Sequence, residues 1–357
     1  MKRIVLAGLG LFALLLTGAT PAEKPVDLAR LMDATPAPTL DAYGLFQDAG
    51  ARTPTASLTP YALNSPLFSD YAEKLRFVYL PPGGKAQYRP TGVLEFPVGT
   101  TIVKTFAYPA DFRHPDKDLR YVETRLLIRR TSGWVPLDYV WNKEQTSAVL
   151  KRAGARFDVA FTNTAGKPVS FSYSAPNANQ CKECHALSET LTPIGPKARN
   201  LNGDFAYASG PENQLAHWTK AGLLEGAPAL DTIPATPHWG DEKTPLKARA
   251  LAYLDANCAH CHNAKGTANN SGLYLDLEQQ SVVNRGIGKR PVAAGRGAGG
   301  LDFDISPGHP EQSIMLHRMA SREPGVMMPE LGRGLVHDEG VALITAYIAA
   351  MDKEAAR

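Results

Sequence analysis

This chain of 357 residues has few of the features that place most sequences in a class. It has only four cysteines, all within two short motifs, so none remains for a structural disulfide. After residue 16 no stretch approaches the roughly 18 uninterrupted apolar residues of a transmembrane helix. No Lys/Arg cluster of the kind that follows a phosphate backbone is present, so nucleic acid is not an expected partner.

The N-terminus has the pattern of a secretory signal peptide. Met1-Lys2-Arg3 precedes an apolar run over residues 4–16 and the small residues of 17–22, which predicts cleavage near Ala22. No cysteine at the end of the apolar run could carry a lipid anchor. Removing Lys2 and Arg3 leaves 36 basic residues against 35 acidic ones. We therefore expect a nearly neutral exported protein without a membrane anchor, located in a bacterial periplasm.

Each cysteine motif has the form C-x-x-C-H. The first is Cys181-Lys182-Glu183-Cys184-His185 and the second is Cys258-Ala259-His260-Cys261-His262. On a helix, residues i, i+3 and i+4 share one face, so two thiols and one imidazole converge on one cofactor. This is the attachment motif of haem c, in which the cysteines form thioethers and the histidine binds iron. The sequence predicts two covalent haem c groups, with His185 and His262 as proximal iron ligands.

Two other cofactor chemistries use the same residue types. A zinc ribbon pairs its halves over about 15–20 residues, whereas Cys181 and Cys258 are 77 positions apart. A redox-active dithiol follows an apolar strand and opens a helix in a βαβ unit, which neither motif does. Haem is therefore the preferred interpretation.

Local patterns predict a multidomain chain. After the signal peptide (1–22), a proline-rich leader (23–69) has Tyr43, Leu45 and Phe46 as anchors, and a β-rich region (70–175) follows. Seven strand-like runs there predict an all-β sandwich-like domain: 75–80, 92–96, 101–108, 120–129, 134–141, 156–161 and 169–173. Charged residues at alternate positions of 123–129 suggest that one sheet face is exposed to water.

The rest of the chain is expected to hold mainly α cytochrome c-type haem modules, at 176–245 and 246–357. A helix is predicted to start at Pro211, another over 246–254 runs into the second motif, and a third covers 338–351. The rigid loop 192–196 is positioned to present a backbone carbonyl to His185, with Pro196 as the candidate.

Methionines and histidines are the candidates for the sixth iron ligand. Met327 and Met328 lie in a loop stiffened by proline and glycine, so one of them is expected to reach the second haem. Met315 and Met319, one helical turn apart, fit core packing instead. No methionine lies between residues 186 and 257, which leaves His217, His238, a methionine from elsewhere or an open position for the first haem.

Residues 246–357 resemble a class I cytochrome c domain: a helix, C-x-x-C-H, a Met-Pro loop and a C-terminal helix. The runs 272–276, 306–313 and Met328-Pro329 are similar to planctomycete-type cytochrome c modules. This resemblance implies Met328 as the distal ligand of the haem held by His262. The whole mature chain resembles a family of predicted exported dihaem c-type cytochromes with a β-rich N-terminal region, through residues 61–71, 96–106, 180–185 and 257–262. The resemblance implies haem and export.

The leading functional hypothesis is a periplasmic electron carrier that passes electrons between redox partner proteins and is not an enzyme. The alternative is a dihaem peroxidase or haem-linked oxidase with an open first haem. No acid–base pair is evident near that haem, although Glu183, Glu212 and Gln214 keep the alternative open. A third hypothesis makes the β-rich region a docking or carbohydrate-binding module.

Overall fold

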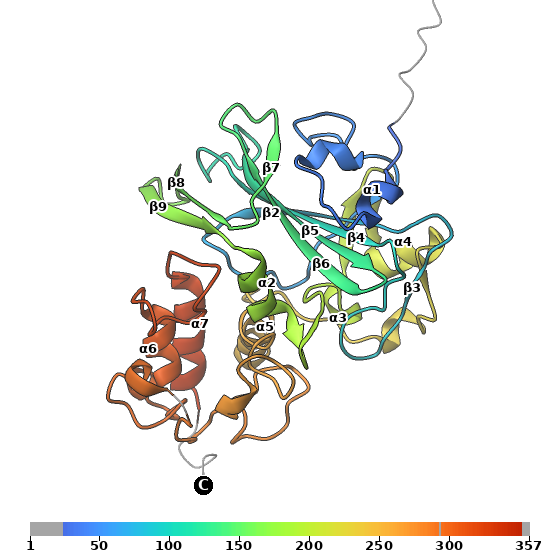
Figure 1. Ribbon diagram of the computed structural model, residues 1–357. Coiled ribbons are helices and arrows are strands. Elements are labelled where there is room, and N and C mark those ends of the chain that lie inside the picture. The colour runs from blue at the N-terminus through green and yellow to red at the C-terminus, as the bar shows by residue number, and fades with distance from the viewer. Residues whose placement is uncertain (1–23, 293, 352–357) are drawn as a thin grey trace, which may run out of the picture.

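A six-stranded antiparallel sheet forms the centre of the upper part of the molecule in the computed structural model (Figure 1). The model describes residues 24–292 and 294–351, so the predicted signal peptide lies outside the described residues. The strand order is β1-β2-β4-β5-β6-β7. The strands are β1 (Leu58–Pro60), β2 (Glu73–Tyr79), β4 (Thr101–Tyr108), β5 (Arg120–Arg130), β6 (Gly133–Trp141) and β7 (Ala148–Leu150).

A separate hairpin of β8 (Ala155–Thr162) and β9 (Pro168–Ala175) leads the chain away from this sheet. Six of the seven predicted strand runs form strands, because their β-branched and aromatic residues alternate between two faces. The run 92–96 makes only isolated bridges, from Val93 to Lys197 and from Glu95 to Gln87.

Each face of the sheet is covered by a different part of the chain. The first face packs on the N-terminal segment, which contains α1 (Leu28–Met32) and η1 (Leu40–Tyr43). The anchors Tyr43 and Leu45 are fully buried there, and the Tyr43 hydroxyl lies 2.8 Å from that of Tyr139.

The second face packs on the chain that follows the hairpin. Val78 and Ile102 of the sheet share a hydrophobic core with Leu201, Leu215 and Trp218. The segment carries α2 (Ala178–His185), β10 (Ala186–Leu187), β11 (Thr190–Leu191), α3 (Ala198–Leu201), β12 (Asp204–Tyr207), β13 (Gly210–Asn213), α4 (Gln214–Lys220), β14 (Leu224–Glu225) and η2 (Leu230–Thr232). β14 also pairs in parallel with β3 (Ala86–Gln87), which precedes β4.

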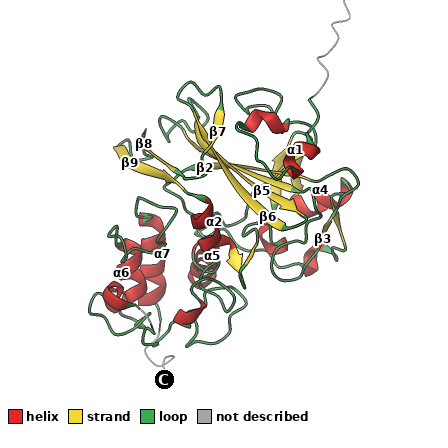
Figure 2. Cartoon of the chain, viewed as in Figure 1, coloured by secondary structure: helices red, strands yellow, loops and turns green. Residues whose placement is uncertain are grey.

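The predicted fold class is wrong in two respects. The structure is mixed, 22% helical and 26% strand, and Figure 2 shows helices beside the sheet in the upper part as well as in the lower part. No second large sheet packs face to face on the first among the described residues, so there is no sandwich. The segment 176–245 contains short strands as well as short helices. Its buried apolar residues share one core with the second face of the sheet.

Two local predictions also need correction. Residues Gly210–Asn213 form strand β13, and the helix starts only at Gln214, where the Asn213 side chain accepts hydrogen bonds from the amides of Leu215 and Ala216. The sheet face predicted to be wet is covered: Glu123 is 0% exposed, Asp138 5% and Arg76 8%.

The lower part of the molecule contains three helices around their own core: α5 (Leu246–Asn257), α6 (Ile314–Ala320) and α7 (Asp338–Ala349). Short 3₁₀ turns connect them: η3 (Asn269–Ser271), η4 (Gly295–Ala298) and η5 (Pro310–Gln312). α5 and α7 pack closely where Tyr253 meets Gly340, because a Cβ atom at Gly340 would lie 2.2 Å from the Tyr253 hydroxyl oxygen. α2 lies between the sheet and α5 in Figure 1.

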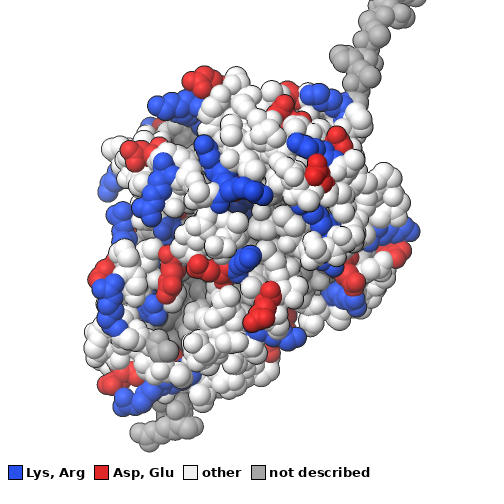
Figure 3. Space-filling view, in the orientation of Figure 1, with Lys and Arg blue, Asp and Glu red and all other residues white. Residues whose placement is uncertain are grey.

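Basic and acidic side chains are interspersed on the face of the molecule shown in Figure 3. Within residues 24–292 and 294–351, no helix has both the length and the apolar character required to cross a membrane.

Candidate functional site

The first C-x-x-C-H motif occupies the C-terminal half of α2. Asn177 caps this helix, since its side chain accepts hydrogen bonds from the amides of Asn179 and Gln180, and Gln180 completes a reciprocal capping box. Cys181, Cys184 and His185 therefore project from consecutive turns of one regular helix.

His185 is held in a single orientation by the loop that follows. Its Nδ1 lies 2.9 Å from the carbonyl oxygen of Thr192. Burial lowers the pKa of His185 to about 4, so the ring is neutral, Nδ1 donates the proton and Nε2 keeps a free lone pair. The predicted loop 192–196 does supply the carbonyl, but it comes from Thr192 and not from the predicted Pro196. The Pro196 carbonyl accepts a hydrogen bond from the Leu94 amide instead.

The second motif begins where α5 ends, with Cys258 as its C-terminal cap. A single helical turn continues through it, since the His262 amide donates to the Cys258 carbonyl at 2.9 Å. The Ser271 hydroxyl lies 3.3 Å from Nδ1 of His262 and itself donates to the Ala268 carbonyl, so it is an acceptor for the imidazole. Burial lowers the pKa of His262 as well. Both motif histidines thus present Nε2 as the available ligand atom.

The two motifs lie side by side although 77 residues separate them in sequence. The Thr267 hydroxyl donates to the Glu183 carbonyl at 2.8 Å, and the Ser188 amide donates to the Lys265 carbonyl at 2.8 Å. The sulfur atoms of Cys184 and Cys261 and a ring nitrogen of His260 all lie within 4.8 Å of one another. The hydrogen bond between the side chains of Cys184 and Cys261 lowers the pKa of Cys261 and raises that of Cys184.

This trio of Cys184, His260 and Cys261 could hold a metal ion by itself. A structural zinc site needs four ligands, and three are present here. Use of the trio would also remove one cysteine from each motif, leaving Cys181, His185, Cys258 and His262 unexplained. A metal site made of this trio therefore leaves four of the six motif residues without a role.

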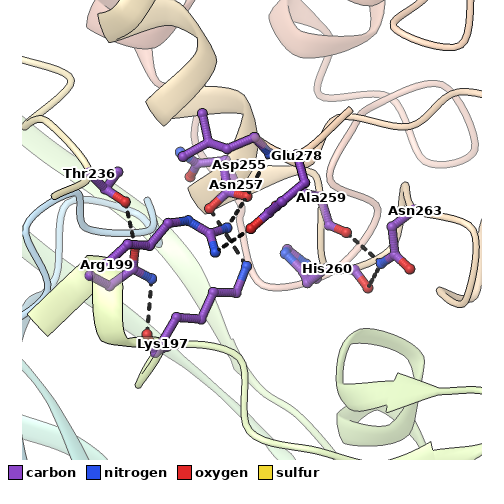
Figure 4. A network of polar contacts seen from close by, with 12 residues as sticks. Lys197, Arg199, Thr236, Asp255, Asn257, Ala259, His260, Asn263 and Glu278 are labelled. Atoms are coloured by element: carbon purple, nitrogen blue, oxygen red, sulfur yellow. Dashed lines mark hydrogen bonds and ion pairs between the residues drawn. The ribbon is translucent and has the colours of Figure 1, made fainter. Parts of the chain in front are cut away.

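A polar contact network joins α5, which leads into the second motif, to α3 (Figure 4). Asp255, three residues before Cys258, points from α5 toward α3, and its carboxylate lies 2.8 Å from Arg199 and 3.6 Å from Lys197. Arg199 also contacts Glu278 at 2.8 Å. Because Asp255 is 3% exposed and Arg199 9%, these contacts are shielded from water and resist rearrangement.

Next to the first motif lies a cavity between α2, the second face of the sheet and the end of α5. Its volume is about 160 Å³, and it opens in part to solvent. Cys181, Cys184 and His185 all line it. Apolar walls come from residues such as Leu63, Ile102, Leu127, Pro136 and Ile194.

Three basic side chains of the sheet line the same cavity. Arg76 of β2, Lys104 of β4 and Arg125 of β5 are direct neighbours in strand register, so they form one row across the sheet, which Asp138 of β6 extends. Nη2 of Arg76 and Nε of Arg125 are buried without a hydrogen-bond partner among the described residues.

These observations test whether the first site suits a haem. A covalent haem needs two thiols and an imidazole on one wall, apolar surfaces for the ring and cationic partners for its two propionate carboxylates. The cavity supplies all three kinds of group, and buried donors without partners are costly unless such a carboxylate satisfies them. The residues present therefore fit this cofactor.

The remaining predicted site residues lie elsewhere. The His217 ring stacks on Tyr207 at a centroid distance of 3.6 Å, and its Nδ1 lies 2.7 Å from Glu212. It does not line the cavity of His185, and neither does His238, whose ring accepts from the Gly240 amide. Met315 and Met319 lie in the core of the helical part.

Met328, the predicted distal ligand of the second haem, is a half-buried residue of the loop after α6. Its amide donates to the carbonyl of Arg318, whose side chain influences the pKa of His262. The loop and the second motif therefore belong to the same part of the helical region.

Sequence reasoning missed the basic row. A sequence signal for this face was present, because alternate positions of one strand hold Glu123, Arg125 and Leu127. Such alternation shows that these residues share a face of the sheet, but it does not show what covers that face. The match of Arg76, Lys104 and Arg125 across three strands depends on register, which the separate runs do not encode.

Comparison of the chain with protein-family models, with curated proteins and with solved structures found no match.

Proposed function

We propose that this protein is an exported electron carrier with two covalently attached haem c groups. Cys181, Cys184 and His185 would hold the first, and Cys258, Cys261 and His262 the second, with Met328 as the second distal ligand. When bound, each haem supplies an iron that gains or loses one electron.

The contact between the two motifs carries this proposal. Cys184 and Cys261, the last thioether positions of each motif, lie within 4.8 Å of each other. Electron transfer becomes steeply slower with distance, so an arrangement that joins the attachment points of two redox centres favours rapid exchange between them. The buried contacts of Asp255 with Arg199 and Lys197 hold α5, which leads into the second motif, against α3.

The roles of the protein residues follow from their contacts. Thr192 and Ser271 accept the Nδ1 protons of His185 and His262, which orients each ring and increases its basicity toward iron. Arg76 and Arg125 balance negative charge at the first site. The apolar cavity walls exclude water, and reduced exposure changes the reduction potential.

The test is to produce the full chain in a bacterium with a haem c attachment system. We expect the protein to be recovered from the periplasm, to retain about two haems per chain on a denaturing gel and to cycle reversibly between ferric and ferrous spectra. The variants Cys181→Ala/Cys184→Ala and Cys258→Ala/Cys261→Ala should each retain about one haem. A chain that matures without covalent haem, or that binds zinc through Cys184 and Cys261, would contradict the proposal.

A further inference from the structure

We propose that Lys104 is the distal iron ligand of the haem held by His185. This inference rests on the proposed function and assigns the ligand that the first motif lacks. The assignment is based on which side chains lining the cavity can offer a lone pair to a metal.

Few groups that line the cavity can act as ligands. His185 is its only histidine, no methionine lines it among the described residues, and Cys181 and Cys184 are used for attachment. Arginine is excluded because its guanidinium does not lose a proton in proteins. The remaining candidates are Lys104, Lys197, Asp255 and Tyr61.

Two of these four are engaged with each other, and a third stays protonated. Lys197 and Asp255 contact each other at 3.6 Å, and Asp255 also holds Arg199. Burial raises the pKa of Tyr61 to about 12, so its phenol stays protonated and cannot bind iron as a phenolate. Lys104 is left.

The Lys104 amine makes no hydrogen bond or ion pair with the described residues. Its only recorded partner is the ring of Phe106, 4.6 Å from Nζ to the centroid. Lys104 is part-buried and borders the cavity that His185 lines, so its unpartnered amine is free to bind a ligand there.

The position of Lys104 in the row suits an iron ligand. Arg76 and Arg125 flank it on the neighbouring strands, about 4.8 Å to either side. The row places the Lys104 amine on the wall of the cavity that His185 also lines. The flexible four-carbon stem of lysine can extend into the cavity.

The charges around Lys104 favour the neutral amine that a metal requires. Burial lowers the pKa of Lys104 well below its usual value, and the neighbouring Arg76, Arg125 and Lys74 lower it further. Glu123 acts in the opposite direction, but it is paired with Arg125.

A His/Lys iron would differ from the His/Met iron proposed for the second haem. A thioether raises the reduction potential, whereas an amine is a stronger donor and stabilises the ferric state. The second haem would therefore be reduced before the first, and electrons entering at the first haem would move to the second.

The experiment compares Lys104→Ala, Lys104→Arg and Lys104→Met in the full dihaem protein by visible, near-infrared and electron paramagnetic resonance spectroscopy. In the unchanged protein both haems should be low-spin. In Lys104→Ala and Lys104→Arg one haem should become high-spin and bind about one carbon monoxide per chain. Arginine keeps the positive charge but cannot ligate, so it separates ligation from pairing with a propionate. In Lys104→Met that haem should acquire the spectrum of His/Met ligation and a higher reduction potential.

Lys74→Ala is the matched control. Lys74 is on the adjacent strand, two register positions from Lys104 on the same face, but it does not line the cavity and donates to the Ala72 carbonyl. It should leave both haems low-spin. The second haem serves as an internal control for folding, since its spectrum should be unchanged in every variant.

Two low-spin haems in Lys104→Ala or in Lys104→Arg would overturn the assignment while leaving the dihaem protein intact. Absence of covalent haem from the unchanged protein would refute the proposed function, and this inference with it.

Discussion

Gly340 shows how one residue determines the packing of two helices. It lies in the first turn of α7, where a Cβ atom would meet the Tyr253 hydroxyl oxygen at 2.2 Å and its ring carbon Cζ at 2.4 Å. Alanine normally stabilises a helix by about 1 kcal/mol relative to glycine. Here the Tyr253 ring would have to move, which makes Gly340→Ala destabilising.

We expect Gly340→Ala to lower the free energy of unfolding by about 1–3 kcal/mol, as overpacking does. Urea denaturation followed by circular dichroism measures this. The exposed Ala342→Gly is the control in the same helix and should cost about 1 kcal/mol from propensity alone. A stabilised Gly340→Ala protein would show that α7 can shift away from Tyr253.

Single residues also define how far the sequence could be interpreted. The motif residues could be proposed as a haem c attachment site because their spacing is typical of one. The acceptor of the His185 proton could not, because Thr192 and Pro196 lie in the same rigid loop and any residue can supply a backbone carbonyl. The position of Lys104 between two arginines could not be predicted either, because Arg76 and Arg125 lie on other strands and their alignment depends on strand register.

At the scale of elements, the buried carboxylate of Asp255 connects α5 to α3. Removing it takes the buried charge partner from Arg199, which is 9% exposed, and leaves only Glu278, whose side chain is 44% exposed. Breaking such a buried pair from one side costs about 3–5 kcal/mol. We expect Asp255→Ala to lose that much stability, measured by denaturant unfolding of the purified protein.

The exposed pair of Arg290 and Asp302 is the control. Its atoms lie 3.0 Å apart with 72% and 69% of the side chains exposed, so Asp302→Ala should change stability by less than about 1 kcal/mol. Equal losses at the two sites would mean that the buried network contributes no more than a surface pair.

Strand and helix positions were largely predictable, because period-two and helical patterns are local. The error lay in how elements combine. Charged residues at alternate positions of 123–129 predicted a wet face, yet the segment after residue 176 covers it and shares a core through Leu201, Leu215 and Trp218. A sandwich was predicted because local patterns show strands without showing what packs on them.

At the scale of the whole molecule, His337 joins the upper and lower parts. Its ring stacks on Phe68 at 4.2 Å and meets Trp239 at 4.9 Å, while Nδ1 lies 3.0 Å from the Tyr253 hydroxyl. Burial lowers the pKa of His337 to about 4 from a usual value of 6.5. The folded protein therefore holds this ring neutral.

The consequence is a loss of stability in acid. Between pH 6.5 and about 4 the unfolded chain binds a proton at residue 337 that the folded protein does not. The free energy of unfolding that depends on neutral His337 is therefore fully present above pH 6.5 and declines as the pH falls to about 4. At one unit of pKa per 1.36 kcal/mol it amounts to about 3 kcal/mol. We expect His337→Gln to be less stable than the unchanged protein at pH 7.5 and to show a shallower decline toward pH 4.5 in thermal unfolding. Identical slopes would exclude His337 as the titrating group.

The closeness of Cys184 and Cys261 also bears on how the protein is made. A chain that folded before receiving its cofactors would bring these two thiols together across the boundary between its upper and lower parts. In an oxidising compartment a covalent bond between them would compete with thioether formation at both motifs. On the proposed function, haem attachment would have to come before completion of the fold, and a delay in attachment would damage both sites at once.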